Sequence, residues 1–141
     1  MPKVDFYILP NDNPNGRLLL ACRLAEKAYN LGHRIYIQTD SNDQARRLDD
    51  LLWAFRDGSF VPHALCPVAA DDVSPILIGT GADSSVEADV LINLAAELPS
   101  SFERFQRVAE LVNQEPDILR TSRQRFRVYQ QQGISPEIHK L

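Results

Sequence analysis

Two short apolar runs constrain the fold of this chain more than any other feature of its sequence. Residues 75–79 (PILIG) and 89–94 (DVLINL) are mostly apolar, without the alternation of apolar and polar residues that marks a half-exposed strand. Strands that are apolar on both faces are typical of parallel sheets covered by helices on both sides. The two runs are therefore predicted as buried strands of a mainly parallel sheet.

The rest of the chain alternates between strand-like and helix-like patterns. β-Branched and aromatic residues predict strands at 4–9 and 34–38, and the stretch 59–75 is predicted as mostly loop. Helices are expected at 18–29, where Gly32 forms a left-handed cap, and at 41–58, which begins with an S-x-x-Q capping box and ends at Gly58. A third helix is expected at 100–112, where a second capping box is followed by Phe105, Val108, Leu111 and Val112. A fourth is expected at 116–133. The order β-α-β-α-β-β-α-α predicts one three-layer α/β/α domain over residues 1–141.

Composition is that of a globular protein of the cytoplasm. Hydrophobic residues make up 44% of the 141 residues and charged residues 24%, which excludes a disordered or collagen-like chain. No apolar run approaches the roughly 18 residues of a membrane-spanning helix, and no charged-then-apolar leader opens the sequence. Cys22 and Cys66 lack the spacing of a zinc ribbon or a disulfide framework, so we expect reduced packing cysteines.

Motifs for catalysis and cofactor binding are absent or poorly formed. The turn at 79–84 (GTGADS) follows a strand as a dinucleotide-binding loop does, but its sixth residue is Ser84 and no amphipathic helix follows. The P-loop and the G-x-S-x-G elbow are missing. His63 has no second histidine at a metal-ligand spacing and is expected to be a satisfied or exposed histidine. We therefore expect no catalytic site, no cofactor and no metal; a nucleotide site at 79–84 is a lesser alternative.

Charge is distributed unevenly along the chain. The formal net charge of −4 argues against a general nucleic-acid binder. From Arg120 to the end, however, five basic residues face one acidic residue, which leaves +4 on this segment and −8 on the rest. A basic segment on an acidic body indicates a local anionic partner.

The last predicted helix carries this positive charge on one face. Arg120, Arg123 and Arg127 fall at i, i+3 and i+7, and Phe126 lies beside them. Arginines next to an aromatic ring can bind a carboxylate attached to an apolar side chain, as in acidic or C-terminal peptides. They can equally bind single-stranded nucleic acid stacked on Phe126 and Tyr129, or form a solvated basic face near the end of a helix.

A second group of residues is rich in large apolar side chains. Trp53, on the helix predicted at 41–58, is followed within ten residues by Phe60, Val61 and Pro62. Tryptophan and phenylalanine anchors are enriched at the centres of protein–protein interfaces. The group therefore predicts either a partner-binding surface or side chains that close the core.

Five segments spread over nearly the whole chain form a recognisable set. They are FYIL at 6–9, RLDDLLW at 47–53, SFVPH at 59–63, DVLINL at 89–94, and RQRFRVY at 123–129 leading to Gly133. The L-D-x-x-L-W and S-F-V-P-H elements are the most specific of them. With these segments the sequence resembles the chi subunits of the bacterial DNA polymerase III holoenzyme, which belong to its clamp-loader assembly.

The resemblance implies a noncatalytic adaptor with a Rossmann-like fold and no functional nucleotide site. In that family, the surface around the tryptophan and the F-V-P-H segment holds the psi subunit, and a helicase-like accessory protein competes for it. The basic helix takes the acidic C-terminal tail of single-stranded DNA-binding protein. The resemblance places psi binding on Trp53, Phe60, Val61 and Pro62, and tail binding on Val112, Arg120, Arg123, Phe126 and Arg127.

The chain departs from the family at two of the tail-binding positions. Phe126 stands where a tyrosine is familiar, and a basic residue expected one turn earlier falls at Leu119, with Arg120 as its nearest substitute. The function expected is an accessory subunit of a DNA-directed DNA polymerase (nucleotidyltransferase) complex, which reaches DNA only through another protein. Direct binding of single-stranded DNA by the same helix is the alternative.

Overall fold

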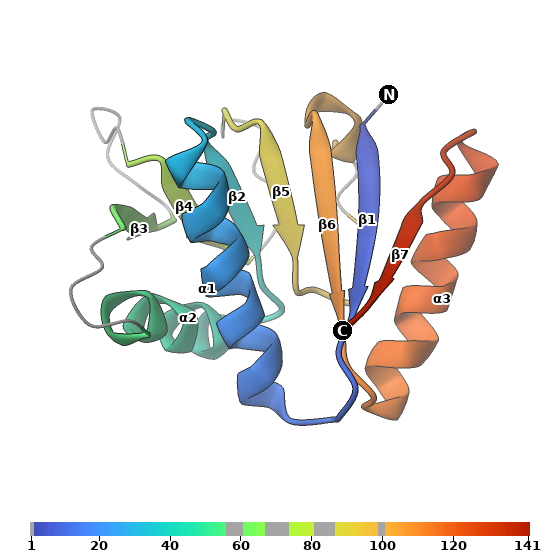
Figure 1. Ribbon diagram of the computed structural model, residues 1–141, viewed down its shortest axis with the longest axis horizontal. Helices are drawn as coiled ribbons and strands as arrows, with labels where there is room; N and C mark the ends of the chain where they lie inside the picture. The colour runs from blue at the N-terminus through green and yellow to red at the C-terminus, as the bar shows by residue number, and fades with distance from the viewer. Residues whose placement is uncertain (1, 56–60, 67–73, 81–86, 99–100) are drawn as a thin grey trace.

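A single parallel sheet forms the centre of the protein. The structure is a computed structural model that describes residues 2–55, 61–66, 74–80, 87–98 and 101–141. The strands are β1 (Lys3–Ile8), β2 (Ile35–Gln38), β3 (His63–Leu65), β4 (Ile76–Gly79), β5 (Val90–Asn93), β6 (Arg107–Val112) and β7 (Glu137–Lys140). They lie in the order β3-β4-β2-β5-β6-β1-β7, and every neighbouring pair is parallel (Figure 1).

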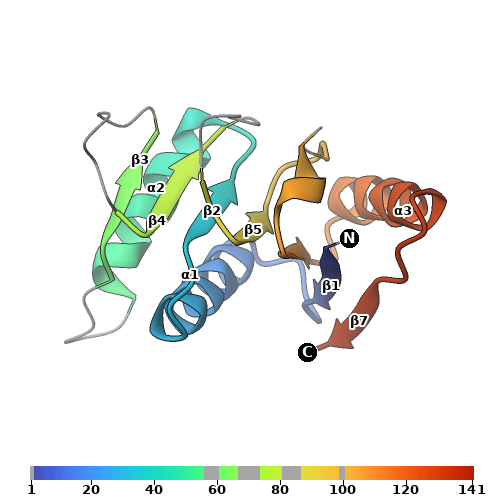
Figure 2. The same cartoon turned by 90° about the horizontal axis from the view of Figure 1, so that it is seen from above.

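The helices cover both faces of this sheet. They are α1 (Pro14–Asn30), α2 (Asn42–Ala54) and α3 (Pro116–Gln131), with a short 3₁₀ helix, η1, at Phe102–Arg104. The connections through α1 and α2 cross the sheet toward β3, whereas the connection through α3 crosses toward β7. Because such crossovers are right-handed, α1 and α2 lie on one face and α3 on the other (Figure 2). The three-layer α/β/α prediction is confirmed.

Each face of the sheet has its own hydrophobic core. Ile37, Ile78 and Ile92 point toward α1 and α2, and Tyr36, Leu77 and Leu91 point toward α3 and η1. The strands predicted at 75–79 and 89–94 correspond to β4 and β5, and every residue of these two strands is buried. Among the described residues, no helix is long and apolar enough to cross a membrane.

The helix signals read from the sequence have direct structural counterparts. Ser41 caps α2 by accepting a hydrogen bond of 3.1 Å from the Gln44 amide, as the capping box predicts. Gly32 follows α1 with φ of 86°, which a residue with a side chain rarely adopts. The end of α2 predicted at Gly58 lies outside the described residues, and the helix itself ends at Ala54.

The prediction of a helix at 100–112 is wrong. This segment forms only η1 and then β6, which is inserted between β5 and β1. The spacing of Phe105, Val108 and Leu111 fits a helix, but all residues from Val108 to Val112 are buried, as in a strand covered on both faces. Glu110 interrupts the apolar run and conceals this strand in the sequence.

Two edge strands were also not predicted. β3 lies within the stretch 59–75, which was predicted as mostly loop, and β7 follows the last predicted helix. Each has three or four residues and a single neighbouring strand, so neither shows a long apolar run. Together with β6 they extend the sheet from the four predicted strands to seven, and they bring new residues to both of its edges.

Candidate functional site

The exposed face of α3 is strongly basic. Glu115 caps the helix through a 3.0 Å hydrogen bond from the Ile118 amide, and Pro116 occupies its first turn. Arg120, Arg123 and Arg127 are all exposed on this helix, as the sequence predicted. Arg120 lies 3.5 Å from Asp117 on the same helix, whereas Arg123 and Arg127 have no ion pair within the described part of the chain. Two guanidinium groups are thus available to a partner.

Phe126 supplies an aromatic ring between these arginines and the sheet. Its side chain is half-buried, and its ring centroid lies 5.2 Å from that of Phe6 on β1, at an interplanar angle of 60°. Tilted aromatic contacts at this distance are favourable and hold a ring in one orientation. Phe126 therefore presents one part of a fixed ring to solvent beside Arg123 and Arg127.

Val112 does not share the surface of α3. Its predicted place on a helix was wrong, because it is the last residue of β6, pairs with Ile8 of β1 and is 1% exposed. Its side chain belongs to the core beneath α3, together with Phe6 and Phe126. A tail-binding role for Val112 stays a prediction, and in this structure the residue supports the surface from below.

Strand β7 adds two residues to this region that the sequence did not reveal. In register, Ile138 lies beside Phe6 and Lys140 beside Ile8, so both point to the same side of the sheet as α3. Ile138 is 52% exposed and Lys140 is also exposed. We call the exposed region formed by Arg120, Arg123, Phe126, Arg127, Ile138 and Lys140 the basic-helix surface.

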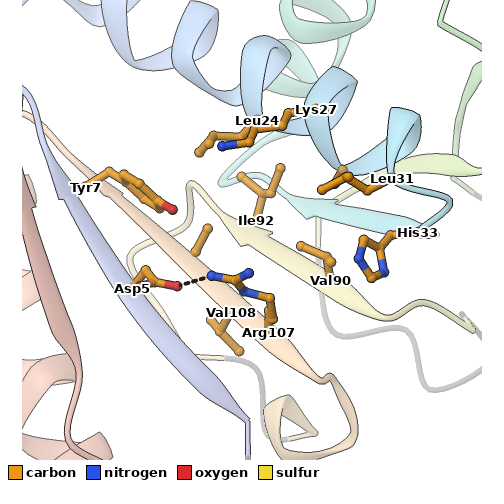
Figure 3. Close-up of a pocket in the computed structure, with 12 residues that line it drawn as sticks. Asp5, Tyr7, Leu24, Lys27, Leu31, His33, Val90, Ile92, Arg107 and Val108 are labelled. Atoms are coloured by element: carbon orange, nitrogen blue, oxygen red, sulfur yellow. Dashed lines mark hydrogen bonds and ion pairs between the residues drawn. The ribbon is translucent and has the colours of Figure 1, made fainter.

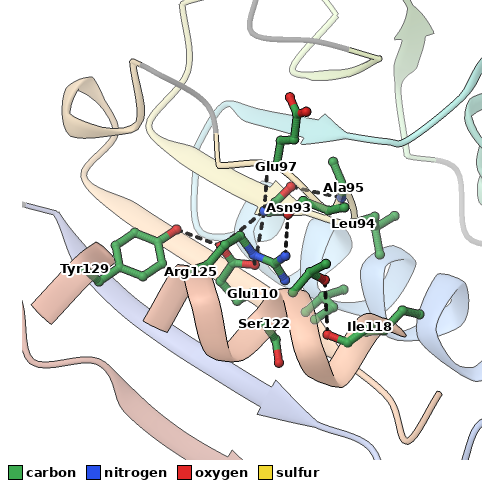
Figure 4. Close-up of polar contacts among 12 residues, drawn as sticks. Asn93, Leu94, Ala95, Glu97, Glu110, Ile118, Ser122, Arg125 and Tyr129 are labelled. Atoms are coloured by element: carbon green, nitrogen blue, oxygen red, sulfur yellow. Dashed lines mark hydrogen bonds and ion pairs between the residues drawn. The ribbon is translucent and has the colours of Figure 1, made fainter. Parts of the chain in front are cut away.

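The opposite face of α3 is anchored by buried polar groups. Glu110 of β6, fully buried, accepts hydrogen bonds of 3.0 Å from Arg125 Nε and 2.7 Å from the Tyr129 hydroxyl (Figure 4). Burial and the neighbouring carboxylate raise the pKa of Tyr129, so it stays a neutral donor. Arg125 and Tyr129 are one helical turn apart and fix the rotation of α3 about its axis.

This buried cluster continues into the neighbouring strand. Asn93 of β5 donates to both oxygens of Glu110 at 3.1 Å, and Arg125 donates to the Ala96 carbonyl at 2.7 Å (Figure 4). The sequence count of basic residues placed Arg125 in the positive segment, but its charge is balanced inside the protein by Glu110. One feature of the sequence could have indicated that Arg125 is buried: at helical spacing it does not share the face of Arg120, Arg123 and Arg127.

The second predicted surface lies at the far end of the sheet, where α2 packs against β3. Trp53 is 55% exposed, and its ring centroid lies 4.6 Å from that of His63. The His63 side chain has no exposed area, with Nδ1 2.7 Å from the Val61 carbonyl oxygen and Nε2 3.1 Å from Asp49 Oδ1. Nδ1 is therefore satisfied, whereas Nε2 is at ion-pair distance from Asp49 but has no hydrogen-bond partner among the described residues, so the expectation of a satisfied histidine is met only in part. His63 links the L-D-x-x-L-W and S-F-V-P-H elements in space.

The other residues predicted for this surface differ in their exposure. Val61 is 2% exposed and packs in the core between the sheet and the two helices α1 and α2. Pro62 is half-buried. Phe60 lies outside the described residues. Of the three residues that the structure describes, Trp53 is therefore the one that offers a large exposed side chain, whereas Val61 closes the core.

The two surfaces lie at opposite edges of the sheet. Trp53 is next to β3, the first strand in the spatial order, and the basic-helix surface includes β7, the last one. They also belong to opposite layers, since α2 and α3 cover different faces (Figure 2). The two surfaces therefore share no residue.

Gln114 bridges part of the crevice that nucleotide-binding proteins of this architecture use, and a pocket lies beside it, lined by residues that include Arg17, Asp40, Ala95 and Glu115. In open α/β sheets this crevice lies at the carboxyl ends of two neighbouring strands whose following helices cover opposite faces of the sheet. Here these strands are β1, which is followed by α1, and β6, which is followed by α3. Gln114 spans this position, its amide donating to the Asn11 carbonyl and its side chain to the Leu9 carbonyl, both at 2.9 Å. Gly79 of the predicted turn is also explained by packing, because a side chain there would collide with the Tyr36 hydroxyl. Gly81 to Ser84 lie outside the described residues.

Comparisons with known proteins give one consistent result. A family model described as the DNA polymerase III chi subunit, HolC, matches residues 1–137. The chain is 42% identical over 141 residues to DNA polymerase III subunit chi of Pseudomonas aeruginosa, covering 100% of this chain and 98% of the relative. The chi subunit of Escherichia coli K12 is 31% identical over 140 residues, with 96% and 95% covered. That of Haemophilus influenzae is 30% identical over 129 residues, with 91% and 90% covered.

Proposed function

The chain belongs to the family of DNA polymerase III chi subunits, and from that premise we propose that it acts as a noncatalytic adaptor of the holoenzyme. One surface would bind the psi subunit of the clamp loader and the other the acidic tail of single-stranded DNA-binding protein, in the cytoplasm. The observation that carries this proposal is the placement of two chemically different surfaces at opposite edges of one sheet. A rigid sheet between them suits a protein that links two partners.

The surface around Trp53 supports the binding of psi. Its exposed indole is held against His63, whose own position is fixed by Asp49 and Val61. A large aromatic side chain that is both exposed and oriented before binding loses little entropy on association. Phe60 and Pro62 extend the proposed surface along the chain. A helicase-like accessory protein would compete with psi for it.

Replacing Trp53 with alanine is expected to abolish co-purification with psi. Truncating a central interface tryptophan costs about 2 kcal/mol or more, a weakening of roughly thirtyfold or greater. The fold should survive, because more than half of the side chain is exposed. Leu31→Ala is the matched control, since Leu31 is 69% exposed at the end of α1, away from this surface. A Trp53→Ala protein that still forms a stable psi complex would refute the assignment.

The basic-helix surface supports the binding of an acidic peptide that ends in an apolar residue. Arg123 and Arg127 offer hydrogen-bond donors to carboxylates, and Phe126 and Ile138 offer apolar surface beside them. Lys140 adds a further positive charge at the same side of the sheet. A terminal carboxylate and an adjacent apolar side chain would therefore find complementary groups within one surface.

Single-stranded DNA is the alternative ligand for this surface, and a paired titration separates the two. We expect an acidic peptide ending in phenylalanine to bind at low salt, and to bind more weakly at high salt because charge attraction contributes. A bare oligonucleotide should bind poorly, since Tyr129 is buried and unavailable for stacking. The measurement is fluorescence anisotropy with both labelled ligands. Tight binding of the oligonucleotide without binding of the peptide would favour the alternative.

A further inference from the structure

The face of the sheet opposite α3 is open near β1 and β7. α1 packs over β2, β5 and β6 on this face, and a pocket lies between α1 and the side chains of Asp5, Tyr7 and Arg107 (Figure 3). Solvent therefore reaches this end of the sheet. Neither of the two proposed partner surfaces uses it.

Three side chains that can ligate a metal ion meet at this open end. Asp5 of β1 is paired in register with Glu137 of β7, and Tyr7 with His139, so all four point to the same face. Asp5 Oδ1 lies 2.9 Å from His139 Nε2, which lies 3.8 Å from Glu137 Oε2. The three ligand atoms lie within 4.8 Å of one another.

This geometry suits a small divalent ion. Bonds from nitrogen or oxygen to such an ion are about 2.0–2.2 Å long, which places adjacent ligand atoms roughly 3–3.5 Å apart. The two separations that involve His139 Nε2 bracket this range. The Tyr7 ring stacks on the His139 ring at 4.8 Å and 16°, so the imidazole is already oriented toward Asp5.

Two neighbouring cations contact the proposed ligand carboxylates, and one of them does so at a ligand atom. Arg107 bonds the other oxygen of Asp5, Oδ2, at 3.1 Å. Burial tends to raise the pKa of Asp5, but hydrogen bonds from His139 and Arg107 outweigh it and lower the pKa, so the carboxylate is charged at neutral pH. Lys3 lies 3.8 Å from Glu137 Oε2, with both side chains more than half exposed, so this contact is easily displaced.

We propose that Asp5, Glu137 and His139 form a binding site for a divalent transition-metal ion such as Zn²⁺, Ni²⁺ or Co²⁺, completed by water from the open face. Imidazole nitrogen together with carboxylate oxygen is a ligand set that such ions accept. The ion would replace the hydrogen bond between His139 and Asp5, and would join β7 to β1. This inference is independent of the adaptor function.

The test is calorimetric titration of the purified, untagged chain with NiCl₂, with CoCl₂ absorption as a second readout of nitrogen and oxygen ligation. We expect one site, whose affinity falls at least about tenfold in His139→Ala and in Glu137→Gln, as for loss of one ligand. Lys3→Ala should raise the affinity a few-fold, because it removes a competing positive charge. His33→Ala is the matched control, since in the described part of the chain His33 contacts a single carboxylate, that of Asp89.

Thermal unfolding of each variant checks that the fold is retained, and peptide binding by the basic-helix surface checks it independently. Absence of measurable binding to the wild-type chain would overturn the proposal. Binding that is unchanged in His139→Ala would overturn it too, because the ion would then lie elsewhere. An equal loss in His33→Ala would place the ion at the other histidine and contradict the assignment.

Discussion

Replacing Arg123 with alanine is expected to weaken binding of an acidic peptide ending in phenylalanine by about tenfold to a hundredfold. A hydrogen bond to a charged group contributes about 1.5–3 kcal/mol, and Arg123 has no competing ion pair within the described residues. Arg123 is exposed, so its replacement should leave the free energy of unfolding nearly unchanged. Isothermal titration calorimetry with wild-type and variant protein measures the difference.

Two further arms make this experiment specific. Arg46→Ala is the matched control, because Arg46 is an exposed helical arginine on α2 whose ion pair among the described residues is with Asp43, at 4.0 Å. If Arg123 binds the terminal carboxylate, amidating the C-terminus of the peptide should weaken its binding to the wild-type protein. The same amidation should change binding to Arg123→Ala much less, because the partner of the carboxylate is already absent. Equal affinity of Arg123→Ala and the wild type for the acidic peptide would remove the tail-binding assignment from this residue.

The sequence predicts the buried centre of the fold better than its edges. β4 and β5 are apolar at nearly every position because helices cover both of their faces, and the run itself carries that information. β3 and β7 have one neighbouring strand each and half-exposed side chains, so their composition does not differ from that of a loop. The seven-strand order follows from tertiary pairing, which no local pattern encodes.

The error at 100–112 has a different cause. A buried glutamate within an apolar strand breaks the run that otherwise marks a parallel strand, and the remaining apolar residues fall at helical spacing by coincidence. Glu110 is tolerated there because Asn93, Arg125 and Tyr129 satisfy its carboxylate. These partners lie on β5 and α3, 15 to 19 residues away along the chain, so the compensation becomes visible only in the fold.

For the candidate sites, the sequence identified side chains with a regular local spacing. Arg120, Arg123 and Arg127 share a helix face because the helix repeat fixes their relation. Ile138 and Lys140 were missed because they reach the same surface through the pairing of β7 with β1. Val112 was misplaced together with the strand that contains it. The helix pattern therefore predicted four of the six residues of the basic-helix surface, and strand pairing supplied the other two.

Replacing Glu110 with glutamine is expected to lower the free energy of unfolding by about 3–5 kcal/mol, the usual cost of removing one partner from a buried ion pair. Arg125 would remain charged at 3% exposure without a counter-ion. The side-chain NH₂ group of the new glutamine would also be a hydrogen-bond donor that faces the donors of Arg125, Asn93 and Tyr129. Because marginal domains are stable by about 5–15 kcal/mol, this loss is a large part of the total.

Urea denaturation followed by circular dichroism measures this loss, and Glu103→Gln is the control, since Glu103 is exposed on η1. The loss should shrink in the Arg125→Met background, because the buried positive charge is then absent as well. If the Glu110–Arg125 pair also fixes the rotation of α3, Glu110→Gln should weaken peptide binding at Arg123, a residue it does not touch. A stability change below about 1 kcal/mol, within the range of surface substitutions, would show that the pair does not anchor α3.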